Sequence, residues 1–174
     1  MARATDESTI WTRQFFTFVA LGLVAAALLV GFFLWWNRKG HLELRGGIQK
    51  TRIQATDDNS SMAVLDFRVT NPSEVPFVVQ EVKVILIDAD GKEVEGTVAA
   101  EVDAERVMNY YPALSPKYNK SMTTRDKVNP EQTIDRMVMA GFPVSEAQLN
   151  ARKNLLVRIF DVDGAVSELA ERRP

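Results

Sequence analysis

The 174-residue chain contains no cysteine and a single histidine, His41. The absence of cysteine excludes disulfides, thiolate metal sites and a cysteine nucleophile. His41 has no nucleophilic residue near it in sequence, so a Ser–His–Asp site would need a distant serine. The sequence also contains no cluster of metal-ligating residues. We therefore expect no cofactor, no metal site and no enzymatic activity.

Loops that hold phosphates or calcium are missing as well. Gly46-Gly47 lacks the spacing, and the following Lys-Ser/Thr, of a phosphate-binding loop. Asp88-Ala89-Asp90-Gly91 and Asp161-Val162-Asp163-Gly164 share part of a calcium-loop pattern. In both, glycine follows the second aspartate directly, which suits the left-handed position of a β-turn. We predict two turns and no calcium site.

The chain carries no strong charge of either sign. It has 21 Lys and Arg against 23 Asp and Glu, a formal net charge of −2. Because the tail before the apolar segment is itself neutral, residues 38–174 keep the same net charge. A near-neutral domain gives no reason to expect a nucleic-acid partner.

One long apolar segment runs from Phe15 to Trp36, with no charged residue between Gln14 and Asn37. As a helix it would be about 33 Å long, enough to cross a bilayer core of roughly 30 Å. Trp11 and Trp35-Trp36 flank it, as is typical of residues at membrane interfaces. We predict an N-terminal tail at 1–13 and a transmembrane helix at 14–37, with the lipid bilayer as a partner.

Two alternatives to an uncleaved anchor remain open. A cleaved signal peptide has a shorter apolar stretch and a small-residue cleavage site, whereas this segment ends in Phe-Phe-Leu-Trp-Trp-Asn-Arg-Lys. A core helix of a soluble protein usually has a polar face.

Small residues four apart allow another helix to approach closely in lipid. They predict a helix-packing face formed by Gly22, Ala26, Ala27 and Gly31.

The remaining residues show the alternation of β-strands. Ala63, Leu65, Phe67 and Val69 alternate with polar residues, as in a half-buried strand. Ser145 and Gln148 have the spacing of a capping box, which predicts a short helix to about residue 152. Other strands are predicted at 48–56, 77–87, 93–100, 133–140, 155–162 and up to 169. We predict an all-β, immunoglobulin-like antiparallel β-sandwich at 48–170, after a linker at 38–47 and before a frayed tail at 171–174.

The sequence from Phe67 to Ser73 (Phe-Arg-Val-Thr-Asn-Pro-Ser), followed by Val82-x-Val84-x-Leu86-x-Asp88-Ala89-Asp90-Gly91, resembles the type 2 late-embryogenesis-abundant (WHy) domains and the bacterial FxLYD modules. Residues 156–164 are similar to their closing strand. The resemblance implies a seven-stranded, mostly non-enzymatic sandwich that one helix holds at a bacterial cell surface. No literal Phe-x-Leu-Tyr-Asp occurs, and 101–128 has no counterpart.

The membrane orientation follows from two conflicting arguments. Basic residues after the apolar segment favour a cytoplasmic domain by the positive-inside tendency. Arg45 and the later ones are expected to belong to the folded domain, however, and domains of this length cross regardless of charge. Together with the resemblance, this favours the exocytoplasmic side of the cell (inner) membrane.

Residues 106–127 differ from a plain sandwich within the predicted insertion at 101–128. They contain five basic residues, one acid and all three tyrosines, types that are enriched at protein interfaces. An irregular connection of this length is uncommon unless it is functional or disordered. The candidate partner-binding residues are Arg106, Tyr110, Tyr111, Lys117, Tyr118, Lys120 and Arg125.

Four interpretations of this segment remain open: a loop packed on its own sandwich, docking on another membrane protein, contact with anionic lipid headgroups, and single-strand nucleic-acid binding. We expect a non-enzymatic accessory subunit that interacts with another integral membrane protein. The alternative is a membrane-tethered sensor or binding module for a lipid, a cell-wall component or a small ligand.

Overall fold

The computed structural model describes residues 13–37 and 43–172. It consists of two units, which divide between His41 and Leu42. His41 and the residues of the N-terminal tail up to 12 lie outside the described residues.

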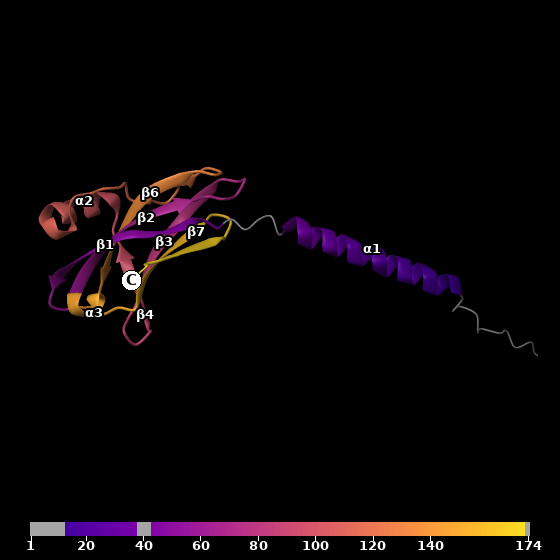
Figure 1. Cartoon of the computed structure of the whole chain (residues 1–174), viewed down its shortest axis with the longest axis horizontal. Coiled ribbons are helices and arrows are strands. Elements are labelled where there is room, and N and C mark those ends of the chain that lie inside the picture. The colour runs from indigo at the N-terminus through magenta and orange to yellow at the C-terminus, as the bar shows by residue number, and fades with distance from the viewer. Residues whose placement is uncertain (1–12, 38–42, 173–174) are drawn as a thin grey trace, which may run out of the picture. The chain divides into compact units, whose positions relative to one another are not determined.

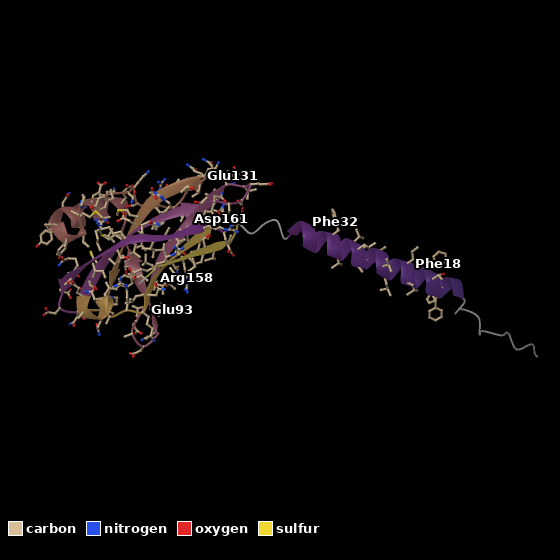
Figure 2. All side chains as sticks on the ribbon, viewed as in Figure 1. Phe18, Phe32, Glu93, Glu131, Arg158 and Asp161 are labelled. Atoms are coloured by element: carbon tan, nitrogen blue, oxygen red, sulfur yellow. The ribbon has the colours of Figure 1, made fainter. Side chains whose placement is uncertain are left out.

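The first unit contains the helix α1, Arg13–Asn37, which confirms the helix predicted at 14–37 (Figure 1). From Phe15 to Phe32 it is long and apolar enough to cross a membrane, and no residue of this stretch is buried by other parts of the chain. Side chains such as Phe18 and Phe32 project from its surface (Figure 2). Apart from the neighbouring residues and the backbone of α1 itself, no atom lies within 4 Å of a Cβ built at Gly22 or Gly31. Packing of another helix on this face stays a prediction.

The second unit is all-β and antiparallel, as predicted. Its strands are β1 (Arg45–Asp57), β2 (Ser60–Thr70), β3 (Phe77–Ile87), β4 (Glu93–Val98), β5 (Lys127–Val128), β6 (Thr133–Phe142), β7 (Asn154–Asp161) and β8 (Val166–Ala170). Between them lie the helices α2 (Glu101–Tyr110) and α3 (Glu146–Asn150) and the 3-10 turn η1 (Pro112–Leu114).

The strands form one curled sheet in the order β1-β2-β6-β4-β3-β7-β8, with β5 paired to β3. The two ends of this order meet, because Ile48 of β1 forms a bridge with Glu171, directly after β8. The inner face encloses the main core, in which Phe67, Phe77 and Leu155 are at most 1% exposed. Burial of this shared face stabilises the curled arrangement.

Two boundaries differ from the prediction. The linker predicted at 38–47 includes the start of β1, since Arg45, Gly46 and Gly47 pair with the end of β2. The glycines suggested a linker, but a Cβ at Gly46 would lie 1.9 Å from the carbonyl oxygen of Arg68, so this strand pair requires glycine there. The frayed tail predicted at 171–174 begins too early.

Glu171, the first residue of that predicted tail, is held in the fold. Its carboxylate accepts two hydrogen bonds from Arg152, at 2.7 and 2.9 Å. Its backbone N–H donates to the carbonyl of Leu155. These contacts fix the end of the chain against the domain at least as far as Glu171.

The predicted turns and helix cap are confirmed. Gly91 and Gly164 have φ values of +89° and +87°, the left-handed conformation that glycine adopts easily. The Asp161 carboxylate, labelled in Figure 2, accepts hydrogen bonds from the N–H groups of Val78 and Asp163. Ser145 and Gln148 form the reciprocal capping box at the start of α3. The aspartates of these sequences therefore act in turn formation.

Candidate interaction surface

The insertion at 101–128 begins with the ten-residue helix α2, so the prediction of an irregular connection is wrong for this part. Glu101 and Asp103 in its first turn stabilise the positive end of the helix dipole. The apolar residues on one side of α2 and directly after it follow helical spacing, at Ala104, Val107, Met108 and Tyr111. This pattern was a signal in the sequence that could have identified the helix.

A second, smaller core lies between α2 and the outer face of the sheet. Val64 of β2 and Met137 and Met139 of β6 point outward and are at most 1% exposed. Ala104 and Met108 of α2 cover them, together with residues from η1 that include Leu114. Figure 1 shows α2 beside β2 and β6. The insertion is thus packed on its own sandwich, and burial of this cluster fixes α2 in place.

A buried ion pair attaches the chain after α2 to β1 and β2. Asp66 is one of the polar residues that alternate with Leu65 and Phe67, a position typical of the solvent side of a strand. Its side chain is nevertheless only 6% exposed, and that of Arg52 is 7% exposed. Arg52 Nη2 donates to Asp66 Oδ2 at 2.8 Å, and Asn119 Nδ2 donates to Asp66 Oδ1 at 2.9 Å. Burial of such charges is tolerated only when each is paired and hydrogen-bonded.

The second terminal nitrogen of the Arg52 guanidinium, Nη1, binds the insertion directly. It donates to the carbonyl of Leu114 and, at 2.7 Å, to the carbonyl of Pro116. The guanidinium therefore links a carboxylate on β2 to two backbone carbonyls of the insertion. Loss of either charge would leave the other one buried without its partner.

The three tyrosines predicted as partner-binding residues are not gathered in one place. Tyr110 and Tyr111 contact each other edge to face, with ring centroids 4.8 Å apart. Tyr111 packs against the second core, whereas Tyr110 is 77% exposed. Tyr118 lies over β1, its ring centroid 4.7 Å from Lys50 Nζ and 5.1 Å from Arg52 Cζ. Of the three, Tyr110 is the most accessible to a partner.

The positive charge predicted for residues 106–127 is largely compensated by the acids of α2. Lys117 Nζ contacts Glu101 Oε1 at 2.9 Å and Glu105 Oε1 at 2.6 Å. The hydrogen bond from Lys117 lowers the pKa of Glu101, while the hydrogen bonds to Glu105 and Glu101 raise the pKa of Lys117. Arg106 pairs with Asp103. A strongly basic surface therefore does not form here.

Lys120 and Arg125, the two remaining predicted residues, lie elsewhere along the insertion. The carbonyl of Lys120 accepts a hydrogen bond from Met137 of β6. Arg125 has a φ of +72° and donates its N–H to the carbonyl of Val79 on β3. Both side chains are exposed, but Lys120 lies beside β6 and Arg125 lies beside β3. The seven predicted residues thus do not form a single site.

One exposed strip of α2, which we call the α2 face, is formed by Val102, Arg106 and Tyr110, and the exposed Asp103, Glu105 and Asn109 lie beside it. The three residues of the face are four apart, so they lie on the side of the helix opposite Ala104 and Met108. Val102 is 59% exposed and Tyr110 is 77% exposed. The face combines two apolar side chains with an arginine on a helix whose other side is anchored. The sequence analysis did not predict Val102 as a binding residue, because its candidates were chosen within the basic, tyrosine-containing residues 106–127.

The described residues show no arrangement suited to catalysis with a metal. Within 13–37 and 43–172, no three His, Cys, Asp or Glu side chains gather closely enough to hold an ion. On this surface Arg52 pairs with Asp66, Lys117 pairs with Glu101 and Glu105, and Arg106 pairs with Asp103.

Comparison with known proteins identifies no family. No protein-family model matches the chain, and no curated protein matches its sequence. Among solved structures, it is similar to a functionally unknown protein from Listeria monocytogenes EGD-e, at 12% identity and a TM-score of 0.40, over 76% of this chain and 78% of that one.

A second similar structure is the archaellum periplasmic stator protein FlaG from Sulfolobus acidocaldarius, at 15% identity and a TM-score of 0.30, over 73% of this chain and 98% of that one. A chain of the FlaF and FlaG complex from the same organism matches at 14% identity and a TM-score of 0.29, over 74% of this chain and 87% of that one. These values describe a distant likeness in fold and assign no function.

Proposed function

We propose that the chain is a membrane-anchored, non-enzymatic subunit that binds another integral membrane protein. In this proposal α1 spans the cell (inner) membrane and the β domain lies on the exocytoplasmic side. Anchoring confines the domain to the membrane, which raises its effective concentration near partners in the same membrane. The apolar, uncharged surface of α1 from Phe15 to Phe32 supports this part of the proposal.

The observation that carries the binding role is the α2 face. Tyrosine and arginine are enriched among the residues that dominate interface energies. Tyr110 contributes a large aromatic surface, and its contact with Tyr111 restricts the orientation of its ring. Because the second core holds α2 on the sheet and the Arg52–Asp66 pair holds the chain after it, a partner would order few additional groups. Pre-organisation of this kind reduces the entropic cost of binding.

Site-specific crosslinking in native membranes tests the proposal. Since the chain has no cysteine, Tyr110→Cys gives a unique position for a thiol-linked photo-crosslinker. Val162→Cys is the matched control, because Val162 is also exposed, at 54%, and lies outside α2. We expect one discrete adduct with an integral membrane protein from position 110 only, and a weaker adduct when Arg106→Glu is added. Equal adducts from both positions, or none from position 110, would contradict the role of the α2 face.

One observation favours the second candidate function, a membrane-tethered module that binds a lipid. It is a basic depression on the outer face of β1 and β2, far along the chain from α2.

A further inference from the structure

A depression of about 680 Å³ lies at the start of the β domain, and its lining contains three arginines and no acid. Arg45 opposes Thr70 across the β1–β2 pair, and Gly47 opposes Arg68. Directly opposed residues, and residues two apart on one strand, lie on the same face of a sheet. Arg45, Arg68 and Thr70 therefore surround Gly47. The fourth side, after β8, is formed by Arg172.

The floor of the depression is open because Gly47 has no side chain. A Cβ built at Gly47 would meet no atom within 4 Å, so there is room for a ligand above the backbone. Gly46, in contrast, is required for the approach of β1 to β2. The two neighbouring glycines thus have separate roles: one allows the strands to pair, and the other leaves the floor bare.

Two of the three guanidinium groups are available to an anion. Arg68 forms a two-point pair with Asp135, at 2.7 and 2.9 Å. Within the part of the chain that the structure describes, Arg45 and Arg172 have no ion-pair partner, and both are exposed. Of the acids near the depression, Asp135 pairs with Arg68, Glu171 pairs with Arg152, and Glu43 lies two residues before Arg45 but outside the lining. The lining itself therefore carries positive charge only. This contrasts with the compensated charges around α2.

Phosphate is the anion that this arrangement fits best. Guanidinium groups donate paired N–H groups to phosphate oxygens, and they do so as a planar fork. A bare glycine floor lets a tetrahedral anion approach the backbone closely. The Thr70 hydroxyl is a further group on the same face. Ile48 is the one large apolar residue of the lining, so the depression suits a headgroup better than an acyl chain.

The position of the depression in the chain points to a lipid as the source of the phosphate. Arg45 is the third described residue after α1, and only residues 38–42 lie between the two described segments. From the end of α1 to the start of β1, residues 38–45 extend no more than about 29 Å. If α1 spans a membrane, this short connection keeps the start of β1 near the lipid surface, where basic residues are attracted to anionic headgroups.

We propose that the Gly47 depression binds the phosphate group of an anionic lipid headgroup through Arg45 and Arg172. This inference goes beyond partner binding by α2 and rests on the proposed anchoring of α1. It assigns the domain a contact with the membrane that is separate from the α2 face. The α2 face lies on a helix, whereas the depression lies at the start of β1 and the end of β2, so substitutions at one are not expected to affect the other.

The first test is a titration of the isotope-labelled full chain in a non-ionic detergent, followed by the backbone amide resonances. The probes are glycerol 1-phosphate, inorganic phosphate and glycerol. We expect saturable shifts at Gly46 and Gly47 with both phosphates and none with glycerol. This arm needs no bilayer, so its failure refutes the depression even if α1 is an anchor. Carbonate extraction tests the anchor separately.

The second test distinguishes the two sources of phosphate. The full chain is placed in nanodiscs of phosphatidylcholine alone or with added phosphatidylglycerol, and hydrogen exchange is measured over residues 43–50. We expect at least threefold slower exchange with phosphatidylglycerol. Shifts with inorganic phosphate but equal exchange in both nanodiscs would replace the lipid by a soluble phosphate, and would overturn the proposal.

Substitutions test whether the residues of the depression bind the phosphate. Arg45→Gln with Arg172→Gln is expected to weaken glycerol 1-phosphate binding at least tenfold. Gly47→Glu places a carboxylate in open space over the floor and is expected to abolish binding without disturbing the strand pair. Lys92→Gln with Lys153→Gln is the matched control, since it removes the same charge outside the lining of the depression, directly before β4 and β7. If this control weakens binding as much, general charge rather than the depression explains the effect.

Discussion

Replacement of Asp66 by alanine tests how the insertion is fixed to the sandwich. The change leaves the Arg52 guanidinium, whose side chain is 7% exposed, without its carboxylate. Removal of one partner from a buried ion pair costs about 3–5 kcal/mol. A domain of this size has a total stability of about 5–15 kcal/mol. We therefore expect Asp66→Ala to lose a large part of the free energy of unfolding.

The assay is a urea titration of the full chain in mild non-ionic detergent, followed by far-UV circular dichroism. Asp135→Ala is the matched control, because it breaks the Arg68–Asp135 pair, which joins β2 to β6 on the exposed surface. Exposed ion pairs contribute little to the free energy of unfolding, so the unfolding midpoint of Asp135→Ala is expected to stay close to that of the unmodified chain. A double variant, Arg52→Met with Asp66→Leu, is expected to be more stable than Asp66→Ala, since no charge remains buried.

Two outcomes would refute this reasoning. One is a loss below about 1 kcal/mol for Asp66→Ala, which would mean that the Arg52 charge is solvated or finds another partner. The other is a double variant that is no more stable than Asp66→Ala. In that case the loss would come from packing and not from an unpaired charge.

The other predictions concern strand pairing and pH. Gly46→Ala is expected to destabilise the domain by about 1–3 kcal/mol through overpacking, because its Cβ meets the Arg68 carbonyl, whereas Gly47→Ala is expected to change the urea midpoint little. Equal midpoints would contradict this. Lys117 holds the pKa of Glu101 below its ordinary value of 4.5. A lowered folded-state pKa gives stability that is present above pH 4.5 and is lost as the pH falls below it. Lys117→Met is expected to flatten the fall in stability below pH 4.5, and an unchanged pH profile would contradict it.

Local patterns predicted much of the fold. The alternation of Val82, Val84 and Leu86 placed β3 correctly, because a two-residue period follows directly from strand geometry. The capping box at Ser145 and the two Asp-Gly turns depend on contacts between residues two to four apart. Each of these features is determined by its own short segment. The apolar length that defines α1 is also a local property.

Features that depend on distant contacts were missed. Asp66 sits at a polar position of an alternating strand, and nothing near it in sequence indicates that η1 and Asn119 cover it. The pairing of Gly46 with β2 is likewise a contact between separate segments, and it outweighs the local tendency of Gly-Gly to form a linker. Strand order has the same origin, since it is set by which edges meet.

The α2 face could be predicted from the sequence only in part. The spacing of Ala104 and Met108 is a local signal and identifies the inward side of the helix. The candidate residues were chosen instead by composition, which grouped Tyr110 with Tyr118 and Arg125. The structure separates them because the insertion runs past several strands. Tyr118 lies over β1, whereas Arg125 is hydrogen-bonded to β3. Composition identified the segment, but the direction of each side chain decided which residues are accessible.

The central claim is that an uncleaved α1 holds the β domain at a membrane. The most direct measurement is carbonate extraction of membranes from cells that express the chain, followed by the intact mass of the retained protein. The account predicts that the chain stays in the membrane pellet and still contains the apolar segment from Phe15 to Trp36. Release into the supernatant, or a mature protein that begins after Trp36, would contradict it.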